Sequence, residues 1–241
     1  MSSNNQGGLF FMGLFIAIGI ALCGYFIGQT MYNSKVALNT AEAKGLAERR
    51  VKADRADWSI VYNVKGTKRS EIPDMYKQAE QHQETIVKLL KDSGFDDSEI
   101  EIGVLDYRYE EFRDENNKLV DQQHSLYGNV TVSTHKVDQV GKARANVSKL
   151  IAQGIDIQNL APTFSFTKLN EIKPEMLREA TKNARIAANE FAENAGVKVG
   201  SIQSAYQGSF NIRDAGEEYG DTRKIDKEVR VVTTITFYLT E

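Results

Sequence analysis

The three histidines are the residues of this chain best suited to bind a metal ion or to exchange protons near neutral pH. They are His82, His124 and His135, and none stands in an H-x-x-x-H or H-x-x-E-H spacing. His82 lies in a predicted helix beside glutamines and a glutamate, where a solvent-exposed or boundary position is expected. His124 and His135 lie on or near one long predicted strand, at an odd separation that places them on opposite faces. The spacing therefore predicts no metal site.

The carboxylates gather in two short segments, whereas acid–base catalysis needs two of them to converge in one pocket. Asp96, Asp97 and Glu99 lie at a turn between a predicted helix and a predicted strand. A second group lies in a predicted loop and consists of Glu217, Glu218 and Asp221. Helix capping and solubility account for both groups, so neither predicts a catalytic site.

Other signatures of enzyme sites are missing from the sequence. The segment DENN (Asp114–Asn117) lacks the spacing and the closing glutamate of an EF-hand, and it predicts a hairpin turn instead. No Gly-rich phosphate loop and no G-x-S-x-G elbow occurs. The single cysteine, Cys23, lies in an apolar run and cannot form an intrachain disulfide. We therefore predict no catalytic residue, no cofactor-binding residue and no cofactor.

The charge balance argues against nucleic acid as a partner. The 241 residues carry 30 Lys and Arg against 33 Asp and Glu, a net charge of -3, with a pI near 5.8. Proteins that bind nucleic acid usually show a basic surplus, and the cationic segment TKNAR (Thr181–Arg185) stands near glutamates. Hydrophobic residues make up 41% and charged residues 26%, which is ordinary for a globular chain and argues against global disorder.

Two segments could form interaction surfaces. A stripe of small residues on a predicted helix is expected to pack closely against a sheet, although a helix–helix contact between copies would use the same pattern; it comprises Ala180, Ala184, Ala187 or Ala188, and Ala195. The segment DYRYEEF (Asp106–Phe112) places Tyr107 and Tyr109 on one face of a predicted strand and charged residues on the other. A projecting hairpin could present them to a partner, and an ordinary solvent-facing strand is the alternative.

The N-terminal region contains a segment long and apolar enough to cross a membrane. Leu9–Ile27 has no charged side chain, and its helical length matches a hydrocarbon core of about 30 Å. The basic region and cleavage site typical of a signal peptide are absent. We therefore predict an uncleaved anchor over residues 9–28 after a polar N-terminus of residues 1–8, with a cleaved leader as the alternative. The basic residues that follow favour a cytoplasmic C-terminal part, but a long domain can be exported regardless.

The rest of the chain predicts an α+β fold. A stalk or linker is expected over residues 29–47, and one domain over 48–241. Apolar residues alternate from Ala56 to Val64, which indicates a half-buried strand. Helices are expected at about 73–93, 137–153 and 174–195, and further strands at 99–112, 119–134, 161–169, 199–212 and 228–239. The first helix is expected to have Ser70 as its N-cap, Tyr76 on its apolar stripe and Gly94 at its C-terminal end. The order β-α-β-β-α-β-α-β-β predicts antiparallel sheets with about three packing helices.

The segment ERRVKADRADWSIVYNVKG (Glu48–Gly66) closely resembles the opening strand of the SIMPL-domain family. The pattern Val-Lys-Ala-Asp-x-Ala-x-Trp is found at Val51–Trp58. The similarity continues through LLKDSGFDDSEI, YGNVTVSTHKVDQVGK, LREATKNARIAANEFAENAG and EVRVVTTITFYL, and it covers about residues 45–241.

The resemblance implies a bacterial cell-envelope protein whose domain lies in the periplasm or outside the membrane. Family members have no agreed activity and no catalytic residues to transfer, and some are regarded as oligomeric and associated with stress tolerance. We expect a single-pass inner-membrane protein whose exported domain is a non-enzymatic binding or assembly module, self-associating and contacting an unknown envelope protein. The alternative is a periplasmic enzyme or small-ligand-binding protein whose site forms only in the folded chain.

Overall fold

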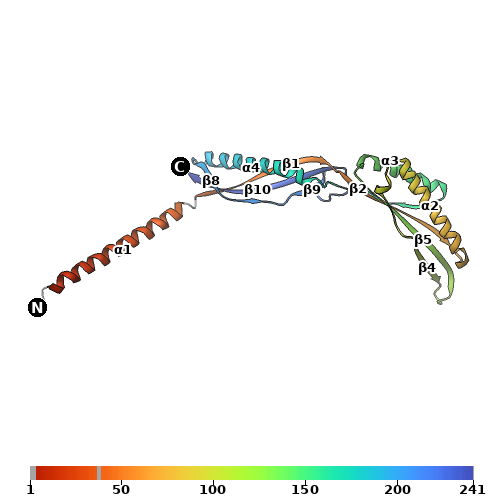
Figure 1. Ribbon diagram of the computed structural model, residues 1–241, viewed down its shortest axis with the longest axis horizontal. Coiled ribbons are helices and arrows are strands. Elements are labelled where there is room, and N and C mark those ends of the chain that lie inside the picture. Colours follow the sequence, from red (N-terminus) through yellow and green to blue (C-terminus); the bar gives the residue numbers. More distant parts are fainter. Residues whose placement is uncertain (1–3, 37–38, 241) are drawn as a thin grey trace. The chain divides into compact units, whose positions relative to one another are not determined.

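The fold is that of a computed structural model, which describes residues 4–36 and 39–240 (Figure 1). The helices are α1 (Asn4–Val36), α2 (Ile72–Asp92), α3 (Val137–Ser148) and α4 (Leu169–Asn194), with 3-10 turns η1 (Arg69–Glu71), η2 (Asp97–Glu99) and η3 (Lys149–Gln153). The strands are β1 (Thr40–Lys52), β2 (Arg55–Gly66), β3 (Ile100–Ile102), β4 (Asp106–Arg113), β5 (Leu119–Thr134), β6 (Asp156–Asn159), β7 (Thr163–Ser165), β8 (Lys198–Gln207), β9 (Asn211–Asp214) and β10 (Asp226–Thr240). The predicted α+β fold with antiparallel sheets is confirmed.

The N-terminal helix α1 contains the predicted apolar segment. Its stretch Phe10–Tyr32 is long and apolar enough to cross a membrane, and none of it is buried against the rest of the chain. A signal sequence near the N-terminus can pass the same test of length and composition. The helix is therefore a membrane anchor or a signal sequence.

The contacts divide the chain into two compact units, where the sequence predicted one domain over 48–241. Unit 1 combines the N-terminal part up to Ala47 with Glu175–Ser209 and the C-terminal part from Val231. Unit 2 combines Glu48–Pro174 with Phe210–Arg230. The strands β1 and β10 and the helix α4 contribute residues to both units.

The prediction of a stalk over residues 29–47 differs from the observed secondary structure. Helix α1 continues to Val36, and β1 begins at Thr40 within the predicted stalk and continues to Lys52. In β1 the small residues Ala41, Ala43 and Ala47 are buried and alternate with exposed charged or larger residues. This is a period-two strand pattern, but its apolar members are too small to stand out in the sequence.

Unit 1 is a sheet covered on one face by α4. The strand order is β1-β10-β8, and α4 buries every fourth residue from Met176: Met176, Ala180, Ala184, Ala188 and Ala192. A Cβ atom on Gly45 would lie 1.8 Å from the carbonyl oxygen of Ala180, so strand and helix backbones are in direct contact there. The predicted packing of the alanine stripe against a sheet is confirmed, although Ala187 and Ala195 are exposed.

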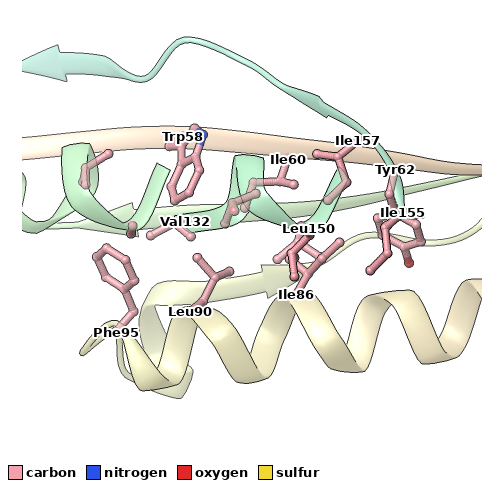
Figure 2. Close-up of a cluster of buried hydrophobic side chains, with 14 of the residues drawn as sticks. Trp58, Ile60, Tyr62, Ile86, Leu90, Phe95, Val132, Leu150, Ile155 and Ile157 are labelled. Atoms are coloured by element: carbon pink, nitrogen blue, oxygen red, sulfur yellow. The ribbon is translucent and has the colours of Figure 1, made fainter. Parts of the chain in front are cut away.

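Unit 2 is built around a larger sheet with the strand order β3-β5-β2-β6, where β4 also pairs with β5 and β7 with β2. The predicted alternation in β2 is confirmed, because Trp58, Ile60 and Tyr62 are fully buried. They share a core with residues of α2 and α3, which pack on the same face (Figure 2). Helix α2 ends before Gly94, which adopts a φ of 92° that favours glycine, as predicted.

Several predicted boundaries in unit 2 were wrong. The strand expected at 99–112 is interrupted at Gly103, whose N–H donates to the carbonyl of Asn129. Strand β6 was missed, and α4 begins at Leu169 with Pro174 inside it. The predicted N-cap Ser70 lies in η1, and Glu71 precedes α2 instead. Tyr76, expected on the buried stripe of α2, is 49% exposed because Met75 takes the core position.

Candidate functional site

An open pocket of about 520 Å³ lies in unit 2 beside the β4–β5 hairpin. Two of its lining residues are Arg69 from η1 and Ile72, the first residue of α2. The other four come from the hairpin and are Tyr107, Tyr109, Gln122 and His124. The register pairs Tyr109 with His124, and the alternation of β4 turns Tyr107 to the same face, as the sequence predicted.

His124 is the most buried residue of this pocket, with 3% of its surface exposed. Its ring stacks on Tyr109 at 4.9 Å and on Tyr107 at 6.0 Å between ring centroids. Its Nδ1 lies 2.6 Å from the hydroxyl of Tyr107, within hydrogen-bond distance. Its Nε2 is buried and has no hydrogen-bond partner among the described residues. One ring nitrogen is thus fixed by the protein, and the other is not.

The hydroxyl of Tyr109 is held by the hairpin. It donates to Glu111 Oε1 at 2.9 Å, and Glu111 in turn accepts a hydrogen bond from Arg113 at 2.6 Å. The hydrogen bond to Glu111 raises the pKa of Tyr109, and the bonds from Arg113 and Tyr109 lower the pKa of Glu111. Tyr109 therefore stays protonated and Glu111 stays ionised near neutral pH.

The histidines are not brought together. His135 is exposed, and its Nδ1 lies 2.6 Å from the backbone carbonyl of Asp54. His82 lies on α2, where burial lowers its pKa. Within residues 4–36 and 39–240, no group of three or more histidines, cysteines, aspartates and glutamates could hold a metal ion. Among the described residues that line the pocket of His124 there is no carboxylate and no second histidine.

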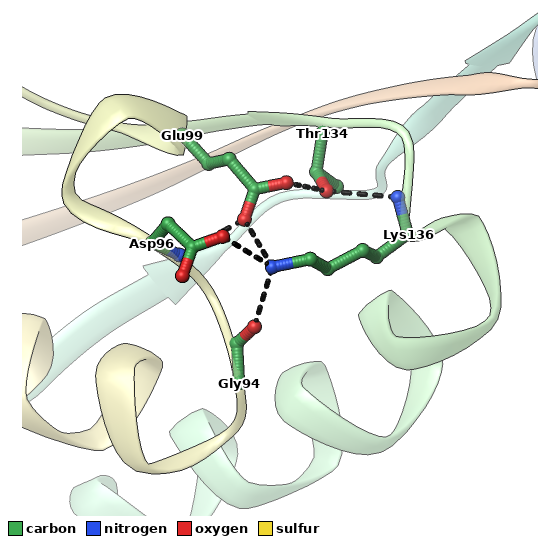
Figure 3. Close-up of polar contacts among 5 residues, drawn as sticks. All are labelled: Gly94, Asp96, Glu99, Thr134 and Lys136. Carbon is green, nitrogen blue, oxygen red and sulfur yellow. Dashed lines mark hydrogen bonds and ion pairs between the residues drawn. The ribbon is translucent and has the colours of Figure 1, made fainter.

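The acidic cluster at the end of α2 binds a lysine. Lys136 Nζ donates to Asp96 at 2.7 Å, to Glu99 at 2.9 Å and to the carbonyl of Gly94 at 2.9 Å, and Thr134 donates to Glu99 at 2.6 Å (Figure 3). Burial alone would raise the pKa of Glu99, but hydrogen bonds from Thr134, the backbone of Asp96 and Lys136 outweigh it and lower the pKa. The cluster ties the turn after α2 to the end of β5.

A buried ion pair organises the loop between β9 and β10, and sequence reasoning missed it. Lys227 Nζ lies 2.5 Å from Asp214 Oδ1, both side chains are fully buried, and Lys227 also donates to the carbonyl of Asp221. Burial alone would raise the pKa of Asp214, but the bonds from Lys227 and the backbone of Arg223 outweigh it and lower the pKa. The partners lie on different strands, so no local sequence pattern reveals the pair.

One of the three predicted loop carboxylates forms an ion pair within the same loop. Glu217 pairs with Lys224 at 2.8 Å. Ile225 packs against the core of unit 2, and its carbonyl accepts a hydrogen bond from the N–H of Ala53. Glu217 is thus held in an ion pair, and none of Glu217, Glu218 and Asp221 lines the pocket of His124.

Unit 1 offers a different kind of surface, the outer edge of β8. Among the described strands β8 pairs only with β10, and every residue from Ser201 to Gln207 is exposed. Register shifts opposite Phe237 distort its first half, whereas Ser204–Gln207 pair regularly with Thr233–Thr236. This regular half carries no charge, while the other edge strand of the sheet, β1, alternates buried alanines with exposed Glu and Lys.

Comparison with known proteins gives one family. The family model described as SIMPL, protein of unknown function (DUF541), matches residues 42–237, which cover both units and leave out α1. No curated protein matches the chain.

Proposed function

Since the chain belongs to the SIMPL family and its apolar N-terminal helix fits a membrane anchor, we propose that it is a non-enzymatic assembly module of the bacterial cell envelope. In this proposal α1 is an uncleaved single-pass anchor in the inner membrane, and the two units lie on the periplasmic side. A contact with a further envelope protein and a link to stress tolerance belong to the same proposal.

The observation that supports self-association is the free edge of β8. An edge strand presents unpaired backbone N–H and C=O groups, and proteins usually protect such edges with charges, prolines or bulges. Strand β1 follows this rule because Glu42 and Lys44 are exposed on it. The segment Ser204–Gln207 has neither a charge nor a proline, and its Tyr206 is 70% exposed.

The arrangement favoured by this edge is an antiparallel pairing of β8 with β8 of a second copy. Such a contact is symmetric, because the same surface serves both partners. Two copies anchored in one membrane also meet at a higher effective concentration than free copies do, which supports a short contact.

The contacts of the carboxylates support the non-enzymatic part of the proposal. Asp96, Glu99 and Asp214 are each held by a lysine, and no carboxylate is among the described residues that line the pocket of His124. That pocket favours small-ligand binding as the second candidate function.

The test is the mass of the full-length chain in a mild detergent, measured by light scattering. We expect oligomers for the wild type and monomers for the double variant Ser204→Lys/Tyr206→Lys, because opposed lysines in a symmetric pair repel each other. The matched control, Ser98→Lys/Tyr219→Lys, places the same substitutions on exposed residues of unit 2 and should stay oligomeric. A monomeric wild type, or oligomers that survive the β8 substitutions, would contradict the proposal.

A further inference from the structure

We propose that the pocket of Arg69, Tyr107, Tyr109 and His124 binds a small planar carboxylate of the aromatic acid type. This goes beyond the proposed assembly function, because the pocket lies in unit 2 and the edge of β8 lies in unit 1. The inference depends on the size and walls of the pocket, on its charge and on the free nitrogen of His124.

The walls favour a flat, partly apolar ligand. The volume of about 520 Å³ falls within the usual range of small-molecule sites. Tyr107 and Tyr109 are 45% and 44% exposed although both stack on the buried ring of His124. Ile72 adds an aliphatic wall. Rings that are fixed on one side and open on the other offer a preformed surface for stacking a planar group.

The charge favours an anion. Arg69 is the one charged side chain that lines the pocket, and it makes no side-chain hydrogen bond or ion pair with the described part of the chain. The nearby acids are already engaged: Glu71 accepts the backbone N–H groups of Thr67 and Lys68, and Glu111 is bound by Arg113. The positive end of the α2 dipole adds to the potential of Arg69. A guanidinium binds a carboxylate through two parallel hydrogen bonds, which makes this anion the best match.

The free nitrogen of His124 favours a ligand with a strong acceptor. A buried polar atom without a partner costs free energy, and a bound water or ligand is one way in which such an atom is satisfied. When the hydroxyl of Tyr107 donates to Nδ1, the ring hydrogen resides on Nε2. Nε2 then donates, and a carboxylate oxygen accepts. A planar carboxylate would therefore satisfy His124 and Arg69 while its ring lies against the tyrosines.

The experiment measures binding of benzoate to the full-length chain in detergent by isothermal titration calorimetry. Benzamide keeps the ring and loses the charge, and cyclohexanecarboxylate keeps the charge and loses the planar ring. We expect saturable binding of benzoate and at least about tenfold weaker binding of either analogue, since a hydrogen bond to a charged group is worth about one such factor or more. Absence of saturable benzoate binding, or equal binding of benzamide, would overturn the proposal.

The variants locate the site. Arg69→Gln and His124→Gln should each weaken benzoate binding about tenfold or more, because each removes one donor to the carboxylate. The matched control is Arg108→Gln, which removes the same charge from the opposite face of the hairpin, where Arg108 lies over Tyr127; its binding should stay within about twofold. The fluorescence of Trp58 reports whether each variant keeps the core of unit 2. An equal loss of benzoate affinity in folded Arg69→Gln and Arg108→Gln would overturn the proposal. Both arginines are exposed, so this pair of variants still tests the proposal if His124→Gln fails to fold.

Discussion

The two units of the chain fill their interiors in opposite ways. Unit 2 packs large side chains such as Trp58, Tyr62 and Phe95 between a sheet and two helices. Unit 1 packs alanines of α4 against Ala43, Ile235 and Phe237, and at Gly45 the strand and helix backbones touch. A core filled by large side chains is most sensitive to lost volume, whereas a core closed by small ones is most sensitive to added volume.

The two units also differ in the kind of surface that we propose for each. In unit 1 the helix covers part of the sheet and leaves β8 exposed at its outer edge. In unit 2 the β4–β5 hairpin carries its aromatic residues around one buried histidine and forms a pocket. An open strand edge suits pairing with another chain, and a pocket suits a small ligand. We therefore assign assembly to unit 1 and ligand binding to unit 2 as separate proposals.

The largest expected effect comes from removing volume in unit 2. Trp58→Ala should lower the free energy of unfolding of this unit by about 3–5 kcal/mol, because the lost transfer energy adds to the cost of a cavity. Hydrogen exchange read by mass spectrometry would show lost protection in β2 and α2. Tyr238→Ala, at a half-exposed position of unit 1, serves as the control for aromatic loss and should have a clearly smaller effect. An equal loss of stability in Trp58→Ala and Tyr238→Ala would contradict the proposed difference between the two cores.

Adding volume to the core should destabilise unit 1 more than unit 2. Ala184→Leu in unit 1 should cost about 1–3 kcal/mol or more, because the close contact of α4 with β1 leaves no room for a longer side chain. Ala143→Leu, at an equally buried position of α3 in unit 2, is the matched control. We expect it to cost less, since large neighbouring side chains can change rotamer. Hydrogen exchange measures the protection lost in α4 and in α3. A larger loss of protection in α3 would contradict this view of unit 1.

The smallest expected effect concerns the polar cluster of unit 2. Lys136→Met should lower the free energy of unfolding only slightly near neutral pH, because the ion pairs of Lys136 are partly exposed. The pKa of Glu99 is lowered from 4.5 in the folded chain, so its contribution is complete above that value and is lost as the pH falls through the lowered folded pKa. Urea unfolding at neutral and acidic pH measures this. The difference between wild type and variant should shrink in acid, and a difference that grows there would be inconsistent with the assignment.

Much of the fold was accessible from the sequence because its patterns are local. The alternation in β2 around Trp58, the bounds of β5 and the position of α2 before Gly94 were all predicted. Strand β1 was missed because its buried residues are alanines, and its partner β10 lies at the other end of the chain.

The pocket could be predicted only in part. The shared face of Tyr107 and Tyr109 follows from the period of a strand, and it was predicted. Their contact with His124 depends on the register of β4 on β5, and the position of Arg69 depends on where α2 begins. Neither can be derived from the spacing of residues along the chain. The buried pair Lys227–Asp214 was missed for the same reason.

The most direct test of the central claim, that the β8 edge joins two copies, is a crosslinking measurement on the full-length chain in membranes. Cys23, the sole cysteine, is replaced by serine, and a single cysteine is placed at Ala205 on β8 or at Leu46 on β1, both exposed. With a short bifunctional thiol reagent, we predict a covalent dimer for Ala205→Cys and a much weaker one for Leu46→Cys. No dimer from Ala205→Cys, or equal dimers from both positions, would contradict the account.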